Sequence, residues 1–328
     1  MMKYDVVALG ELLIDFTPAG TSPAGNPYFE RNAGGAPVNV LAALSRLGRQ
    51  TAFVGKVGDD PFGQYLREAL VAENIADSGL VQTRTAHTTM AFVHLDGDGE
   101  RSFHFCRHPG ADAELTFDEV NRELLSSTRI FHFGSISMTT EPAYSATVQA
   151  VRLAKSHGAL ITYDPNWRPA LWMDDAHSRA AMEEGLHLAD IVKVSEEELV
   201  FLTGSQDLAD GAAQLLNSYP IAQLLVTRGA EGTYYANRTV SGNVSSYPVT
   251  PVDTTAAGDG FMGAFIYRLL ESGKPVTEWE RNELEGAVAF ANAAGAIATT
   301  RKGAIASLAK LDEIAALQHR GGGYADSI

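Results

Sequence analysis

The sequence contains a single cysteine, Cys106, among its 328 residues. One cysteine excludes an internal disulfide and a metal cluster held by several thiolates. Long apolar runs are missing too, because none approaches the ~18–20 residues that a membrane span needs. The first residues, MMKYDVVALGELLIDF, carry acidic side chains within their apolar run and are typical of a β-strand. We therefore expect a cytoplasmic protein with no export signal and no membrane partner.

Basic residues are also scarce, since 25 lysines and arginines stand against 40 aspartates and glutamates, for a net charge of −15. Such a surface repels phosphate backbones, so no nucleic-acid partner is expected. A small phosphorylated ligand remains compatible, because Mg²⁺, helix N-termini and a few local cations can hold it. The nine histidines are scattered, with no H-x-x-x-H or H-E pair on one helix face, and no zinc site is predicted.

Short apolar runs alternate with helical patterns along most of the chain. The predicted strands are YDVVALG, TAFVGKVG, RIFHFGSI, ALITYDP, DIVKVS and AQLLVTRG. One helix is predicted within GGAPVNVLAALSRLG, which ends at Gly48, and another within PFGQYLREALVAENI, which starts at Pro61. Two long helices are predicted between about 257 and 300. GTYYANRTVSGNVSSYPV resembles a meander. This alternation predicts an α/β fold with a mostly parallel sheet covered on both faces.

Two segments break that rhythm. TTMAFVHLDGDGERSFHFC consists of two β-rich runs around a DGDG turn, which indicates a hairpin. TPAGTSPAGNPYFERNAGG is rich in proline, glycine and polar residues. We expect the two segments to lie together outside the main sheet, as a small flap.

The stretch DTTAAGDGFMG, residues 253–263, has two interpretations. Its GDGFMG is a literal G-x-G-x-x-G, the pattern of a dinucleotide site, and would indicate a nicotinamide oxidoreductase. That site also needs a following strand with an acidic residue ~20 positions on, and here helices follow instead. The other interpretation is a turn into a helix, where backbone N–H groups attract an anion and Asp259 can accept a proton. Taken alone, Asp259 could equally be an ordinary helix N-terminal residue.

Two separate motifs resemble the signatures of the ribokinase-like (PfkB) carbohydrate kinases. DTTAAGDGF is similar to their C-terminal signature, usually D-T-T-G-A-G-D-x-F, and GGAPVNVLAALSRLG with VGKVGDDPFG is similar to their N-terminal one. The resemblance runs from Val6 to about Leu308. GELLIDFTP, FHFGSIS, YDPNWRPALW, KVSEEELVFLTG and TTRKGAI resemble the fructokinase branch. ERSFHFCRHPGADAEL resembles fructokinases and also aminoimidazole riboside kinases, and DPNWR…LW is shared with 2-keto-3-deoxygluconate kinases.

The resemblance implies a three-layer αβα sandwich with a mostly parallel sheet and a small β-sheet lid. Residues 1–11, 35–86 and 112–318 would form the main domain, residues 12–34 and 87–111 the lid, and residues 319–328 a flexible tail. It also implies a homodimer that assembles through the lid.

The implied catalytic residues are Asp259 as general base, with the backbone of Ala256, Ala257 and Gly258 as the anion hole. Ala256 stands where glycine is usual, which is tolerated if its φ is negative. The implied sugar-binding residues are Asp15, Gly34, Gly35, Asn39, Phe105 and Arg168. For Arg168 a surface arginine after a turn, and for Phe105 plain strand packing, are the alternative interpretations.

The implied nucleotide-binding residues are Lys193, Glu198, Thr227, Gly229, Gly232 and Asn292. A Walker A sequence is absent, so backbone groups and Mg²⁺ would hold the phosphates of ATP. The family's N-x-x-E motif appears as Ser195…Glu198, with Glu198 associated with Mg²⁺ and serine replacing asparagine. Asp253 and Thr255 match positions beside which a monovalent cation binds, and K⁺ is the hypothesis here.

These features together predict an ATP-dependent kinase of a small sugar, with D-fructose as the expected substrate. Aminoimidazole riboside and 2-keto-3-deoxygluconate are the alternative substrates, and positive charge from Arg107 and Arg168 near the pocket would suit the acidic one. A non-catalytic sugar or nucleotide sensor is the alternative from another class of protein.

Overall fold

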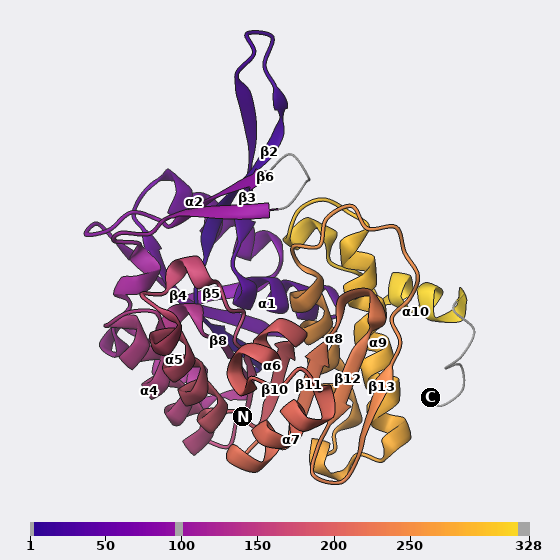
Figure 1. Cartoon of the computed structure of the whole chain (residues 1–328). Coiled ribbons are helices and arrows are strands. Elements are labelled where there is room, and N and C mark those ends of the chain that lie inside the picture. The colour runs from indigo at the N-terminus through magenta and orange to yellow at the C-terminus, as the bar shows by residue number, and fades with distance from the viewer. Residues whose placement is uncertain (1–2, 96–100, 321–328) are drawn as a thin grey trace.

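A computed structural model describes residues 3–95 and 101–320 of the chain. Its main sheet contains nine strands in the order β13-β12-β11-β10-β9-β8-β1-β4-β5 (Figure 1). Their bounds are β1 Tyr4–Leu9, β4 Thr51–Gly58, β5 Ile75–Thr83, β8 Thr128–Gly134, β9 Leu160–Asp164, β10 Ile191–Ser195, β11 Gln223–Thr227, β12 Thr233–Ala236 and β13 Ser241–Val244. At one edge β12 pairs antiparallel with both β11 and β13, and the other pairs are parallel. The mostly parallel sheet predicted from the sequence is thus confirmed.

Helices cover both faces of this sheet, because its strands are apolar on both sides. In β1, Val6 and Ala8 join one buried cluster, and Val7 and Leu9 join the other. The first cluster includes residues of α1 Ala36–Arg46, α2 Pro61–Ala72, α8 Ala257–Ser272, α9 Arg281–Thr299 and α10 Leu311–Arg320. The second includes residues of α3 Arg122–Ser126, α4 Ala143–Ser156, α5 Asp175–Leu188, α6 Glu196–Thr203 and α7 Leu208–Ser218. The fold is therefore the expected three-layer sandwich.

A second sheet of four strands stands apart from the main one, in the order β3-β2-β6-β7. Its strands are β2 Leu13–Thr21, β3 Pro27–Gly34, β6 Met90–Leu95 and β7 Arg101–Cys106. The β2–β3 hairpin projects away from the body of the molecule (Figure 1). The two irregular segments of the sequence do form one small sheet, whereas the DGDG turn lies outside the described residues. The division into two domains at the predicted boundaries stays a prediction.

The two long helices predicted near the C-terminus are α8 and α9, and the predicted meander is the β12–β13 hairpin. Of the predicted tail, residues 319 and 320 belong to α10, and the remainder lies outside the described residues. Across the described part of the chain, every helix is too short or too polar to cross a membrane.

Candidate active site

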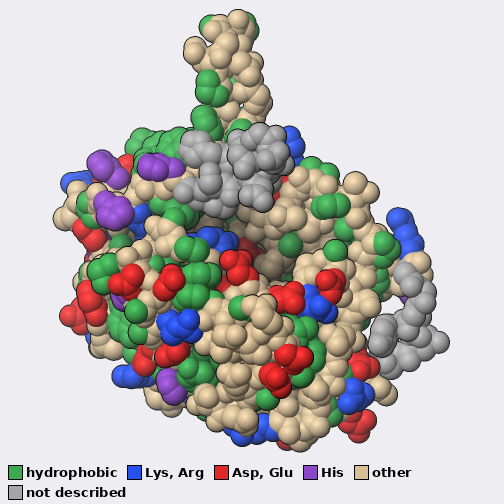
Figure 2. All heavy atoms as spheres, in the orientation of Figure 1, with side chains coloured by type: hydrophobic (Ala, Val, Ile, Leu, Met, Phe, Trp, Pro, Cys, Tyr) green, Lys and Arg blue, Asp and Glu red, His purple; other side chains and the backbone are tan. Residues whose placement is uncertain are grey.

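Strand β1 ends at Leu9 and the small sheet begins at Leu13, so the small sheet lies at the carboxyl ends of the parallel strands. The molecular surface is hollowed below the small sheet (Figure 2). In parallel α/β sheets this edge is the usual place for ligands. Helix α8 begins here, and Asp259 lies in its first turn with only 8% of its surface exposed. The stretch DTTAAGDGFMG is thus a turn into a buried helix, as the second interpretation predicted.

The residue before helix α8 has ordinary backbone geometry. Ala256 is the N-cap, with φ −106° and ψ 15°. A negative φ leaves room for a Cβ, so alanine in place of the family's glycine introduces no backbone strain. The Ala257 N–H donates to the Thr254 carbonyl at 3.3 Å, while Gly258 follows inside the first turn, where helices carry unpaired N–H groups.

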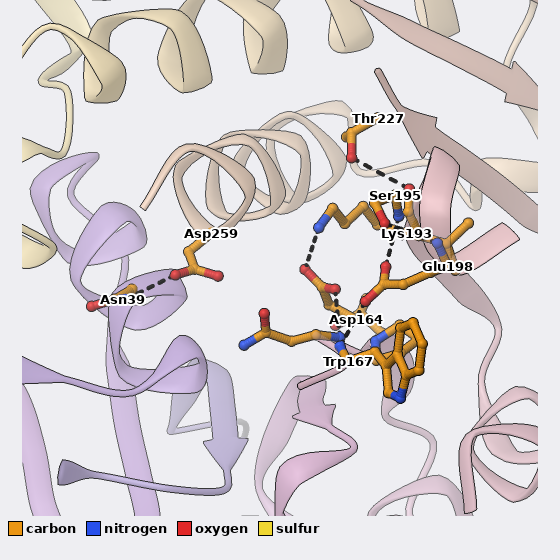
Figure 3. A network of polar contacts seen from close by, with 12 residues as sticks. Asn39, Asp164, Trp167, Lys193, Ser195, Glu198, Thr227 and Asp259 are labelled. Carbon is orange, nitrogen blue, oxygen red and sulfur yellow. Dashed lines mark hydrogen bonds and ion pairs between the residues drawn. The ribbon is translucent and has the colours of Figure 1, made fainter. Parts of the chain in front are cut away.

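Asn39 connects the two signature motifs. Its Nδ2 donates a 2.8 Å hydrogen bond to Oδ2 of Asp259, and both side chains are buried (Figure 3). Asn39 lies in the first turn of α1, directly after the Gly34–Gly35 turn. Its Oδ1 is buried and has no hydrogen-bond partner among the described residues. A buried acceptor left unpaired costs stability, and a ligand hydroxyl would satisfy it.

Burial, followed by the nearby charge of Asp164, raises the pKa of Asp259 to about 6. The hydrogen bond from Asn39 and the charges of Lys193 and Arg168 act in the opposite direction. A carboxylate that gains and loses its proton near neutral pH is suited to general-base catalysis.

A lysine–aspartate pair lies beside the first turn of α8. Lys193, in the middle of β10, donates from Nζ to Oδ2 of Asp164 at 2.8 Å, and both side chains are buried. A Cβ built on Gly258 would lie 2.9 Å from Lys193 Nζ, so the glycine makes room for the ammonium. Burial by itself lowers the pKa of Lys193, but the carboxylates of Asp164 and Glu198 outweigh it and raise that pKa. Lys193 is therefore a fixed positive charge.

Asp15 lies on the face of the small sheet that it shares with Phe105. Asp15 pairs with Ala91 of β6, and Ala91 pairs with Phe105 of β7, so the side chains of this row point to one face. On the other side Asp15 pairs with Asn32 of β3. Burial raises the pKa of Asp15 to about 7, the charge of Arg168 lowers it, and the charges of Asp259 and Asp253 raise it. The charges of Arg168 and Asp259 therefore act on the Asp15 carboxyl group.

The Gly34–Gly35 turn needs glycine at both positions. A Cβ on Gly34 would lie 2.0 Å from Oδ2 of Asp15, and one on Gly35 would lie 2.3 Å from the carbonyl oxygen of Glu11. Gly35 also has φ +123°, which residues with a side chain rarely adopt. The turn therefore lies directly against the Asp15 carboxylate.

Glu11 is a site residue that the sequence interpretation missed. It is 2% exposed, and its Oε1 accepts a 2.8 Å hydrogen bond from the Ala36 N–H, at the start of α1. Burial raises its pKa to about 7. The acidic residue inside the apolar run LGELLID was the available signal, because an acid in a buried strand requires a partner.

Ser195 and Glu198 form a capping box at the start of α6. The Glu198 N–H donates to Ser195 Oγ at 3.1 Å, and Glu198 Oε2 accepts from the Ser195 N–H at 2.7 Å. Glu198 Oε1 accepts from the Trp167 N–H at 2.7 Å (Figure 3). Serine is a good capping residue, which accounts for the departure from the family's asparagine.

The donor set near Glu198 fits a nucleotide-associated Mg²⁺ held mainly by phosphates and water. Within the described residues, no three His, Cys, Asp or Glu side chains gather in a way that could hold a metal ion. Mg²⁺ ordinarily uses one or two carboxylates together with substrate phosphates. Since both oxygens of Glu198 already accept backbone N–H groups, Glu198 fits as an outer partner of such an ion.

The predicted nucleotide residues lie along the end of β11 and the following turn. Thr227 ends β11, and its Oγ1 donates to the Val194 carbonyl at 3.3 Å. Gly229 and Gly232 have positive φ values of 55° and 99°. The backbone of this turn takes a shape that glycine permits, and its contact with the nucleotide stays a prediction.

Asn292 is buried, and both hydrogen bonds from its Nδ2 stay inside the protein. They go to the carbonyls of Val244 at 2.9 Å and Ser245 at 3.2 Å, while its Oδ1 accepts from Thr233 Oγ1 at 2.7 Å. Asn292 thus fastens α9 to the β12–β13 hairpin. A direct contact of Asn292 with adenine stays a prediction. Its amide N–H groups are already used in the hydrogen bonds to Val244 and Ser245.

Asp253 fixes the loop before α8. Its Oδ1 accepts from the N–H and Oγ1 of Thr255, at 2.9 and 2.6 Å, and its Oδ2 accepts from the Gly303 N–H at 3.1 Å. The carboxylate orders the segment that leads to the anion hole. The cation site at Asp253 and Thr255 stays a prediction.

Arg107 is a structural residue and supplies no free charge to the pocket. Its guanidinium is buried and bonds to Oδ2 of Asp112 at 2.8 Å, Thr139 Oγ1 at 2.6 Å and the Ile136 carbonyl at 3.1 Å. The expectation that Arg107 adds positive charge near the pocket is therefore wrong, because Asp112 neutralises it. Arg168 remains.

Comparisons with known proteins agree with this geometry. The family described as pfkB family carbohydrate kinase matches residues 3–311. Fructokinase-1 of Oryza sativa subsp. japonica is 48% identical over 305 residues, which cover 92% of this chain and 94% of the relative. The crystal structure of a fructokinase from Xylella fastidiosa with bound ATP has a TM-score of 0.90 at 34% identity, covering 98% of this chain and 100% of that one. A fructokinase from Vibrio cholerae O395 with fructose, ADP and calcium has a TM-score of 0.85 at 34% identity, with coverages of 96% and 99%.

Proposed function

Since this chain belongs to the pfkB family of carbohydrate kinases, we propose that it transfers the γ-phosphoryl group of ATP to a primary hydroxyl of D-fructose. It is an ATP-dependent sugar kinase, and the choice of fructose is the proposal. The observation that carries the proposed mechanism is the buried Asp259 carboxylate, held by Asn39 in the first turn of α8.

In this mechanism Asp259 removes the proton of the sugar hydroxyl while that oxygen attacks the γ-phosphorus. The bond from the γ-phosphorus to the β,γ-bridging oxygen breaks, and ADP leaves. The backbone at the start of α8, including Gly258, stabilises the charge on the phosphoryl group. Mg²⁺, when bound with the nucleotide, would neutralise phosphate oxygens.

Asp15 supports the sugar-binding part of the proposal. A carboxylate accepts hydrogen bonds from two hydroxyls at once, and Gly34 leaves its oxygen uncovered on the side of the turn. The unpartnered Oδ1 of Asn39 offers a third acceptor. We propose that the small sheet closes over the bound sugar and excludes water, which limits wasteful hydrolysis of ATP.

The charge of the pocket favours a neutral sugar over 2-keto-3-deoxygluconate. Arg107 is neutralised by Asp112, and Arg168 faces the carboxylates of Asp15 and Asp259. A sugar carboxylate would add another negative charge beside these two. Aminoimidazole riboside is neutral and remains the alternative that charge does not disfavour.

The deciding experiment measures ATP-dependent phosphorylation of fructose, ribose, aminoimidazole riboside and 2-keto-3-deoxygluconate, with Asp259→Asn as control. Fructose should give the highest kcat/KM, and the control should lose ~10² or more of the rate. A higher kcat/KM for an acidic sugar would overturn the choice of substrate. Binding of ATP without turnover of any sugar would favour a sensor, and binding of NAD(P)H an oxidoreductase.

For the cation, we propose that K⁺ orders the loop that Asp253 fixes before the anion hole. Exchanging K⁺ for a large organic cation should then lower kcat. An unchanged activity would remove the cation from the mechanism.

We also propose a homodimer assembled through the small sheet. The projecting β2–β3 hairpin exposes two aromatic side chains, Tyr28 at 50% and Phe29 at 37%. Large exposed apolar groups of this kind often mark interfaces. Light scattering should give twice the mass of one chain, and replacing both aromatics with serine should give a monomer. A monomeric wild-type protein would contradict the proposal.

A further inference from the structure

Lys193 lies between two carboxylates that compete for it. It projects from β10 toward Asp164 at the end of β9, and Asp259 on α8 borders the same space (Figure 3). The strands are neighbours in parallel register, with Ile191 opposite Thr162. The charges of Asp164 and Asp259 both act on Lys193, but the hydrogen bond goes to Asp164.

The Asp164 contact determines where the ammonium lies. Lys193 Nζ is held against Gly258, where any larger residue would meet it. An ammonium has three donors, and the bond to Asp164 uses one of them. The remaining N–H groups are available at the first turn of α8, the place where an anion is favoured.

We propose that Asp164 is a positioning residue. It holds Lys193 Nζ beside Gly258, where the ammonium meets the phosphoryl group in transfer, and it prevents Lys193 from pairing with Asp259. This inference rests on the proposed function, because it assumes that Asp259 accepts the proton. Lys193 neither gains nor loses a proton in the step, and the proton of the sugar hydroxyl goes to Asp259.

The physical reason is the cost of an unpaired charge in a buried site. If Asp164 loses its charge, Lys193 is left with the carboxylates of Glu198 and Asp259. Both oxygens of Glu198 already accept backbone N–H groups, so we expect Lys193 to move toward Asp259. An ion pair stabilises the ionised form of Asp259 and makes it a weaker base. The other groups that face Asp259 are Asn39 from α1, Arg168 after β9 and Asp15 from β2, with Asp253 acting on Asp15. None of these changes in an Asp164 variant.

The test is Asp164→Asn in the full chain, assayed with ATP and fructose across pH. We expect kcat to fall ~10- to 100-fold, with a smaller change in the KM for fructose. The acidic limb of kcat/KM should move to lower pH, because the charge of Asp164 no longer raises the pKa of Asp259 and because Asp259 then pairs with Lys193. Lys193→Met should also lower kcat but move the limb to higher pH, because a positive charge near Asp259 is lost.

A matched control is Asp112→Asn, which breaks the other buried pair, with Arg107, away from α8. It should lower stability and leave the position of the acidic limb unchanged. The double variant Asp164→Asn/Lys193→Met removes both charges, so it avoids an unpaired buried ion if the single variant does not fold. The shift of the limb from Lys193→Met to the double variant should be smaller than the shift from wild type to Asp164→Asn, because only the single variant gains the new ion pair. The kcat of the double variant should stay low, and equal shifts would overturn the inference.

An Asp164→Asn enzyme with wild-type kcat, or with reduced kcat and an unmoved limb, would overturn the inference. So would a double variant with wild-type kcat. Failure of the proposed function has a different signature. In that case Asp259→Asn keeps wild-type turnover, or the wild-type protein does not phosphorylate fructose, whatever Asp164 does.

Discussion

The side-chain amide of Asn39 donates a hydrogen bond to the carboxylate of Asp259, although the two residues are 220 positions apart in the chain. Through this contact the glycine-rich turn before α1 and the first turn of α8 form one site. The hydrogen bond favours the ionised form of Asp259, while burial favours the neutral form. The resulting pKa near neutrality links the activity and the stability of the protein.

Asp259→Asn should abolish most of the activity and stabilise the fold at alkaline pH. Burial raises the pKa of Asp259 from 3.8 to about 6, so the ionised carboxylate destabilises the native state by up to about 3 kcal/mol. The gain in the variant should be complete above pH about 6 and vanish as the pH falls toward 4. Denaturant unfolding at pH 8 and pH 4 measures it. A variant less stable than wild type at pH 8 would contradict this.

The pH dependence of kcat/KM should show an acidic limb between about pH 6 and pH 7. Asp259, with a pKa of about 6, must lose its proton to act as a base, and Asp15, with a pKa of about 7, must lose its proton to bind the sugar as a carboxylate. Asn39→Ala should move the limb to higher pH, because the hydrogen bond that lowers the pKa of Asp259 is lost. A limb displaced to lower pH in that variant would show that Asn39 does not stabilise the ionised base.

Gly258→Ala should reduce kcat ~10-fold or more while leaving the fold intact. The new methyl group would meet the tip of Lys193, a flexible side chain that can move away at little cost in stability. Gly286→Ala in α9 is the matched control, because nothing lies within 4 Å of its added Cβ. Steady-state kinetics and thermal unfolding of both variants separate the two effects. Equal kcat in the two variants would exclude a role for the space at Gly258.

Ala256→Gly should restore the usual family residue without raising the rate. The φ of −106° is already accessible to alanine, so glycine relieves no strain. Glycine should instead lower stability by about 0.4–1 kcal/mol, because it enlarges the conformational freedom of the unfolded chain. A several-fold increase in kcat would indicate that the anion hole needs a backbone shape that alanine resists.

Gly34→Ala should raise the KM for fructose at least ~10-fold, more than it changes kcat. The methyl group would overlap Oδ2 of Asp15 and displace the carboxylate that is proposed to bind the sugar. Initial rates at saturating ATP provide the measurement, with Gly286→Ala again as the control. An unchanged KM would remove Asp15 from the sugar site.

The sequence by itself determined most of the alternation of strands and helices, the small β-sheet and the position of Asp259 at a helix start, but it did not reveal β5 Ile75–Thr83. These features depend on local patterns, namely alternating apolar runs, turn residues and short motifs, which indicate the same local structure whatever the tertiary contacts are. The motifs also located the loops around the site. Ser195 could be interpreted locally as well, because a capping box is a contact over three residues.

Only the tertiary structure decided which charges are free and which are paired. From the sequence, Arg107 was expected to add charge near the substrate, but in the structure it pairs with Asp112. Asn292 was expected to lie near the adenine, but its amide donates to a carbonyl of the β12–β13 hairpin. The pair of Asp164 with Lys193 carried no local signal either. A side chain's charge and pKa depend on its neighbours in space, and in a parallel sheet those neighbours come from separate crossover units of the chain.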